Sequence, residues 1–102
     1  MSLPTYTRIS EITIDDLVDY LRLPDVDSAQ LQLLTTIKAA AINYIVGVTS
    51  LKLEDLDNYP DLTLALYALV QDMYDNRTIY VDKANISDTV STILNMYRTN
   101  LL

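Results

Sequence analysis

The sequence predicts an all-α fold, a small bundle of about four helices with an extended loop between the last two. Apolar residues recur at spacings of three and four positions through most of the 102 residues. The single glycine, Gly47, and the prolines Pro4, Pro24 and Pro60 fall between the segments that have this spacing. Half of the residues are apolar and 21% are charged, as in folded globular chains. We therefore expect residues 1–102 to form a single domain.

Capping signals predict where the first two helices begin. Thr13 is expected to cap a short first helix, which Pro24 prevents from continuing. Asp27, followed by Gln30, resembles a capping box that opens a longer second helix, and Gly47 is expected to cap its C-terminus. The apolar stripes are Ile14, Leu17, Val18 and Leu21 in the first helix, and Leu31, Leu34, Ile37, Ala41 and Ile45 in the second.

The third predicted helix begins at Pro60, runs to about Arg77 and has almost no polar side. Such a helix must be covered on all sides, and a chain of this length has few other elements to cover it. Part of its surface is therefore a candidate for burial by another molecule. Its apolar residues are Leu62, Leu64, Ala65, Leu66, Tyr67, Ala68, Leu69, Val70, Met73 and Tyr74.

The remaining segments are expected to be connectors and a fourth helix. Residues 48–59 connect the second and third helices, with one helical turn around Glu54 and Asp55. Residues 78–86 favour extended structure and then a loop. Ser87 or Asn85 can cap the fourth helix, and residues 98–102 are expected to form a tail. The apolar stripe of this helix is Ile86, Val90, Ile93, Leu94 and Tyr97.

Charge and hydropathy argue against two classes of partner. Seven basic and fourteen acidic residues give a net charge of −7, which opposes contact with phosphate backbones, so no specific affinity for nucleic acid is expected. The N-terminus lacks the pattern of a secretory leader, and no apolar run approaches the length expected of a segment that spans a bilayer. We therefore expect no membrane association.

The residue types that usually carry catalysis and metal binding are scarce. The chain has no cysteine and no histidine, and its carboxylates fall mostly at predicted helix starts and turns. The segments that begin at Asp25 and Asp55 resemble the opening of a calcium loop but lack its glycine and its closing glutamate. We expect no enzymatic activity, no metal site and no cofactor.

Eight tyrosines without a phenylalanine or tryptophan are an unusual set of aromatic residues. A tyrosine combines a large apolar ring with a hydroxyl group, so it suits the rim of a core and also an interface. Each one taken singly fits the rim of a core better, whereas the group as a whole indicates an interaction surface. Five fall on predicted helices: Tyr20, Tyr44, Tyr67, Tyr74 and Tyr97.

Three blocks of the sequence, in order, resemble small phage head–tail connector proteins, which are also described as DNA-packaging proteins. The first block comprises residues 12–23, an acidic turn, and the stretch from Leu33 to Ile45. The second is the third helix with its ending at residues 73–77, and the third is residues 90–98. The third block has an isoleucine where the family usually has a second leucine.

The resemblance implies an all-α subunit that assembles as a ring of about twelve copies beneath the portal protein of a tailed phage or prophage. Double-stranded DNA would pass through the ring without specific binding. The partners implied are other copies, the portal protein and the next head-completion or tail protein. The implied location is the head–tail junction of the virion, and the bacterial host cytoplasm during assembly.

Candidate contacts with neighbouring subunits or the portal lie after the third helix and at the C-terminus, where the resemblance places residues 97–102 against the portal. Arg77 could equally form an internal ion pair with Asp72 or Asp75. The candidates are Tyr74, Arg77, Ile79, Tyr80, Val81, Tyr97, Arg98, Leu101 and Leu102.

Two alternative functions remain open: an acidic helical interaction protein, including an inhibitor that mimics DNA, and a small bundle that dimerises without any phage role. A DNA mimic needs carboxylates spaced like phosphates along one exposed face. The carboxylates here cluster at helix starts and turns instead.

Overall fold

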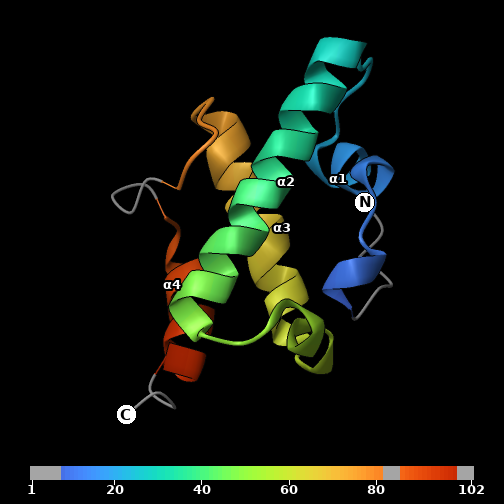
Figure 1. Cartoon of the computed structure of the whole chain (residues 1–102). Helices are drawn as coiled ribbons and strands as arrows, with labels where there is room; N and C mark the ends of the chain where they lie inside the picture. Colours follow the sequence, from blue (N-terminus) through green and yellow to red (C-terminus); the bar gives the residue numbers. More distant parts are fainter. Residues whose placement is uncertain (1–7, 82–85, 99–102) are drawn as a thin grey trace.

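The computed structural model describes residues 8–81 and 86–98, and within them the chain is all-α, as predicted. The helix α3 runs along the middle of the bundle, α2 crosses it, and α1 and α4 lie on opposite flanks (Figure 1). No strand occurs in these two ranges. The elements are the 3-10 segments η1 (Ile9–Glu11) and η2 (Leu53–Asn58) and the helices α1 (Ile14–Leu21), α2 (Ser28–Thr49), α3 (Asp61–Asp75) and α4 (Asp88–Arg98).

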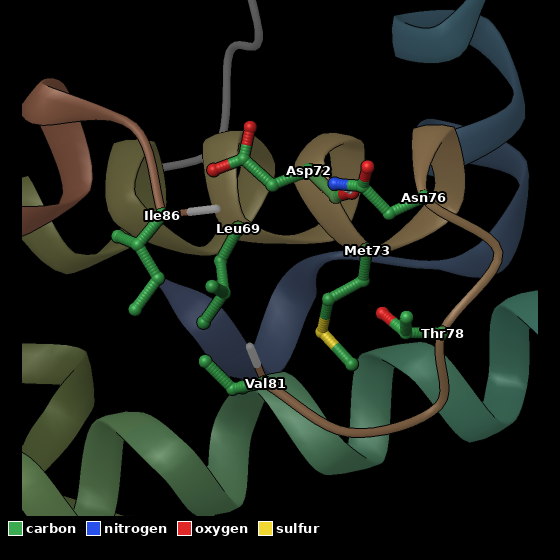
Figure 2. Close-up of a pocket in the computed structure, with 7 residues that line it drawn as sticks. All are labelled: Leu69, Asp72, Met73, Asn76, Thr78, Val81 and Ile86. Atoms are coloured by element: carbon green, nitrogen blue, oxygen red, sulfur yellow. Dashed lines mark hydrogen bonds between the residues drawn. The ribbon is translucent and has the colours of Figure 1, made fainter. Parts of the chain in front are cut away.

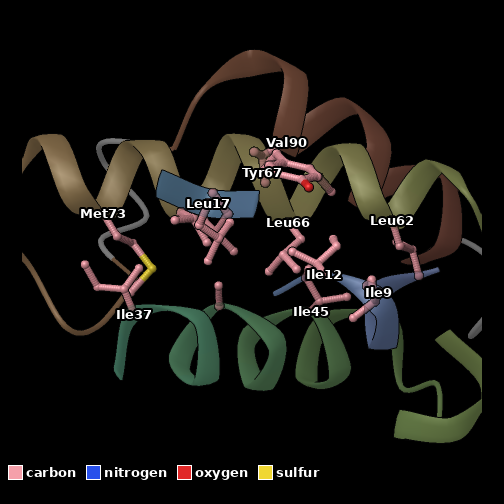
Figure 3. Close-up of a cluster of buried hydrophobic side chains, with 14 of the residues drawn as sticks. Ile9, Ile12, Leu17, Ile37, Ile45, Leu62, Leu66, Tyr67, Met73 and Val90 are labelled. Atoms are coloured by element: carbon pink, nitrogen blue, oxygen red, sulfur yellow. The ribbon is translucent and has the colours of Figure 1, made fainter. Parts of the chain in front are cut away.

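The apolar helix α3 forms the centre of the core. Helices α1, α2 and α4 and the segment η1 all pack against it. Leu66 points from α3 toward Ile12 and Ile45 (Figure 3), and the Tyr67 ring lies 4.8 Å from the ring of Tyr20 in α1, centroid to centroid. The chain itself covers α3 along most of its length, so only a small part of its surface remains a candidate for burial by another molecule. The exception is Leu64, which is 52% exposed.

The predicted N-terminal caps of α1 and α2 are confirmed. The Thr13 hydroxyl accepts a hydrogen bond from the Asp16 backbone N–H at 3.1 Å, and the Asp16 carboxylate accepts one from the Thr13 N–H at 2.8 Å. Asp27 and Gln30 form the same reciprocal pair at 2.8 and 3.2 Å. Each pair satisfies two backbone donors that the helix itself leaves without partners.

Replacing Asp27 with alanine is expected to lower the free energy of unfolding by about 1 kcal/mol, because α2 loses the acceptor that caps its first turn. The matched control is Asp25→Ala, which removes an exposed carboxylate from the same connector. Urea unfolding followed by circular dichroism measures both variants. Equal losses would contradict a capping role for Asp27.

The predicted C-terminus of α2 is wrong, because the helix continues past Gly47 to Thr49. Ser50 takes the left-handed conformation with φ of 58°, and its N–H donates to the Val46 carbonyl at 2.9 Å. The Thr49 side chain is buried, and its hydroxyl donates to the Ile45 carbonyl one turn earlier in the same helix at 2.7 Å. The predicted turn in residues 48–59 is confirmed as η2, and α3 begins one residue after Pro60.

The expectation that no segment could span a bilayer is also wrong by length and composition. Helix α2 has 22 residues, and Lys38 is its only charged one. Only 22% of its most apolar stretch is buried in the bundle. Core helices of soluble proteins can have the same length and hydropathy. Its inward residues Leu34, Ile37, Ala41 and Ile45 belong to the core. Composition therefore identifies an apolar helix without showing what covers its outer face.

Candidate interaction surfaces

The turn at the end of α3 positions the first group of predicted contact residues. Arg77 takes the left-handed conformation with φ of 54°. The Arg77 N–H donates to the Tyr74 carbonyl at 3.2 Å, and the Thr78 N–H donates to the Met73 carbonyl at 3.0 Å. This is the Schellman arrangement, in which glycine usually occupies the left-handed position. The backbone that leaves α3 is therefore fixed by main-chain hydrogen bonds.

Tyr74, one of the predicted contacts, is a core residue. Its side chain is 5% exposed, and its hydroxyl accepts a hydrogen bond from the Gln30 side chain at 3.3 Å. The Arg77 guanidinium carbon lies 4.2 Å from the centroid of its ring, a cation–π contact. Two hydrogen bonds lower the pKa of the Tyr74 hydroxyl below its usual value. The bond from Arg77 has the larger effect and the bond from Gln30 the smaller. Tyr74 thus has almost no surface to offer a neighbouring subunit.

Arg77 itself is exposed, and its guanidinium packs on an aromatic ring. The ion pair with Asp72 or Asp75 that the sequence left open is replaced by this contact. The Asp72 carboxylate instead accepts a hydrogen bond from the Ser87 N–H at 2.9 Å. Asp72 therefore ties the start of α4 to the end of α3.

The connector between α3 and α4 directs its two largest apolar side chains outward. Ile79 is 56% exposed and Tyr80 is 64% exposed. Val81 turns inward and converges with Leu69 and Met73 on a shallow hollow (Figure 2). The hollow has room for about one water molecule, so it is no ligand pocket. Its lining residues are Leu69, Asp72, Met73, Asn76, Thr78, Val81 and Ile86.

The predicted loop and cap in this region are partly confirmed. Residues 78–81 form bends and irregular backbone, as expected for a loop. The Ser87 hydroxyl accepts a long hydrogen bond from the Val90 N–H at 3.4 Å, so Ser87 caps α4. The other predicted cap, Asn85, lies outside the described residues.

The C-terminal candidates are only partly within the described chain. Tyr97 and Arg98 lie in the last turn of α4, so Arg98 belongs to a helix and not to the predicted tail. The side chains of these two residues, and the whole of Leu101 and Leu102, lie outside what the structure describes. Of this group, the structure therefore places only the backbone of Tyr97 and Arg98, at the end of α4.

Sequence reasoning missed a group of exposed apolar residues at the other end of the bundle. Leu53 is 63% exposed, Leu64 is 52% exposed and Met96 is 58% exposed. They lie where η2 leads into α3 and where α4 ends (Figure 1). The exposure of Leu64 had a signal in the sequence, because Asp61 and Gln71 lie near it on the same face at helical spacing.

Acidic residues gather on the side of η1, α1 and η2. Six of the fourteen lie between Glu11 and Asp27, and four lie between Glu54 and Asp61. The Ser10 hydroxyl and N–H donate to the Asp57 carboxylate at 2.7 and 3.0 Å and join these segments. These hydrogen bonds lower the pKa of Asp57 below its usual value. Helix α2, by contrast, contains no acidic residue.

The described surfaces offer exposed apolar side chains and an uneven distribution of charge. Within residues 8–81 and 86–98, no group of three acidic side chains lies close enough together to hold a metal ion. Comparisons of the chain with protein-family profiles, curated proteins and solved structures found no match. The exposed apolar residues, the charge distribution and the resemblance of the three sequence blocks are therefore the observations that bear on function.

Proposed function

We propose that this protein is a structural subunit of a ring-shaped head–tail connector of a tailed phage or prophage. The ring sits below the portal, forms part of the DNA conduit and completes the head for tail attachment. The observation that carries the proposal is the α3–α4 connector, which directs Ile79 and Tyr80 outward from a fixed backbone. The subunit has no enzymatic role and needs no cofactor.

The fixed backbone favours a contact role for Ile79 and Tyr80. Main-chain hydrogen bonds hold the connector at Thr78, and the inward side chain of Val81 holds it three residues later. Side chains on such a backbone lose little conformational freedom when a partner covers them. Tyrosine is also enriched at interface centres. In the ring, these two side chains meet the neighbouring subunit.

The opposite end of the bundle suits a second partner. Leu53 begins η2, Leu64 lies in the first turn of α3 and Met96 lies near the end of α4, and all three are exposed. The resemblance places the C-terminal residues against the portal, and these three apolar side chains extend the same end of the molecule. A connector subunit needs different surfaces for different partners, because ring contacts between copies are heterologous.

The charge distribution supports a conduit. Seven of the fourteen acidic residues lie in η1, α1 and η2, and one lies in α4. With this side toward the lumen, the ring repels the phosphate backbone and lets DNA slide through. The same acidic side is the observation that favours the second candidate, an acidic interaction protein that occupies the DNA site of an enzyme. That candidate requires a one-to-one complex with a DNA-binding enzyme and no ring.

Replacing Ile79 and Tyr80 together with serine is expected to raise the concentration needed for half-assembly by at least about tenfold. Loss of two exposed apolar contacts of this size costs about 1.4 kcal/mol or more per interface. Native mass spectrometry across a concentration series measures the fraction of rings, and circular dichroism checks that the fold is kept.

The matched control is Leu53→Ser, which alters an exposed apolar residue at the other end. It is expected to leave ring formation unchanged and to weaken capture by the portal. If the Ile79 and Tyr80 double variant assembles as well as the unaltered protein, the connector is not a subunit contact.

A further inference from the structure

The outer face of α2 is a long uncharged surface on a strongly acidic protein. We define the outer stripe of α2 as seven of its exposed residues at helical spacing, Ser28, Gln32, Thr35, Thr36, Ala39, Asn43 and Gly47; Ala29 and Leu31 are exposed as well. A helix of 22 residues is about 33 Å long. The one charged residue of α2, Lys38, donates from Nζ to the Ile12 carbonyl at 2.6 Å and so bonds back to its own chain. Exposed surfaces usually carry charges, so this stripe needs an explanation.

Gly47 gives a second, independent reason to expect a partner. It lies inside α2 without a positive φ, and a Cβ atom added there meets nothing within 4 Å. The subunit alone therefore requires neither the conformational freedom of glycine nor its small size. Glycine inside a helix costs about 1 kcal/mol relative to alanine. Close approach of another backbone is a physical reason for a residue without a side chain at this position.

We propose that a second copy of this chain packs along the outer stripe of α2. This inference rests on the proposed ring and names the surface through which its subunits meet. Each copy carries a charge of −7, and a contact through the side of η1, α1 and η2 would bury repelling carboxylates. The outer stripe has no carboxylate, so the copy that contributes it to a heterologous contact brings no repelling charge.

The position of the stripe agrees with the proposed contact at Ile79 and Tyr80. Gln30, in the first turn of α2, bonds to Tyr74, and Arg77 packs on the same ring. The beginning of the outer stripe therefore lies beside the beginning of the connector. One neighbouring copy can cover both surfaces.

A membrane fits the stripe less well than a second copy. Gln32, Thr36 and Asn43 carry polar groups that would lose their water partners in hydrocarbon. The inward residues Leu34, Ile37, Ala41 and Ile45 are fully buried in the core, so insertion of α2 would dismantle the bundle.

The size of the stripe predicts how the ring forms. A surface about 33 Å long and about 10 Å wide offers about 330 Å² per subunit, less than half of the area in a typical stable pair. Two copies are therefore expected to associate weakly through this surface alone. A closed ring gives every subunit two neighbours, so rings are expected to form with few free dimers.

The test adds one carboxylate to an exposed helical position on either of two faces. Ala39→Glu places it in the outer stripe, and Gln71→Glu places it on the exposed face of α3. Ala39→Glu is expected to raise the concentration for half-assembly at least tenfold, and Gln71→Glu is expected to assemble like the unaltered protein. Circular dichroism confirms folding of both. Rings of Ala39→Glu that are as stable as those of the unaltered protein would overturn the inference and leave the connector function standing.

Cross-linking supplies a measurement that does not depend on loss of assembly. The chain has no cysteine, so Asn43→Cys has a unique thiol for a short photo-reactive label. Labelled protein at assembling concentrations is expected to give adducts of two chains, and Gln71→Cys is expected to give few. Adducts with the portal alone, or with added phosphatidylcholine vesicles alone, would overturn the inference. If the unaltered protein neither forms rings nor binds a portal, the proposed function fails and the inference fails with it.

Discussion

Replacing Leu66 with alanine is expected to lower the free energy of unfolding by about 2–5 kcal/mol. Leu66 is completely buried on the central helix α3 and points toward Ile12 and Ile45 (Figure 3). Truncation of Leu66 removes apolar contacts and leaves a cavity in the core. The cavity lies at α3, the helix against which α1, α2 and α4 pack. Domains of this size typically have a stability of about 5–15 kcal/mol, so the loss is a large fraction of the total.

The matched control is Leu64→Ala, two residues earlier on the same helix. Leu64 is 52% exposed, so the same chemical change is expected to cost less than about 1 kcal/mol. Urea unfolding of both variants measures the difference. Similar losses at the two positions would contradict the assignment of Leu66 to the core and Leu64 to the surface.

Replacing Tyr74 with alanine is expected to cost about 3–5 kcal/mol of stability, because a buried aromatic ring is removed. The change also leaves the Gln30 side chain without its hydroxyl partner and Arg77 without the ring beneath it. The matched variant Tyr74→Phe keeps the ring and removes only the hydroxyl, so it is expected to cost about 1 kcal/mol. Thermal or urea unfolding measures both.

The same two variants separate a core residue from a contact residue. Because Tyr74 is a core residue, Tyr74→Phe is expected to form rings as the unaltered protein does. A direct subunit contact through the Tyr74 hydroxyl would instead weaken assembly of Tyr74→Phe without a matching loss of stability. Native mass spectrometry beside the unfolding curves decides between these outcomes.

The helix starts could be predicted from the sequence because capping is a local interaction. Thr13 and Asp27 each bond to a partner three residues away, and nothing distant is needed to form the pair. The end of α2 could not be predicted in the same way. Its last turn is held by the burial of Thr49 in the core, and this tertiary contact outweighs the helix-ending tendency of Gly47.

The candidate contact residues also differ in whether local sequence or distant packing decides their exposure. Ile79 and Tyr80 follow the end of a helix that is buried almost all round. Their exposure could therefore be predicted from the sequence. Tyr74 is buried in the core and contacts Gln30, which is 44 residues away in the chain. Packing between distant segments also decides the exposure of Leu53 and Met96. This exposure could not be predicted from the sequence around either residue.

The absolute mass of the purified protein, measured by light scattering across concentrations with and without a portal complex, tests the central proposal most directly. The chain mass is 11.6 kDa, so a ring of about twelve copies would have a mass of about 140 kDa. We expect either a species of this size or capture of the protein by the portal. A stable monomer or dimer that does not bind the portal would contradict the connector function.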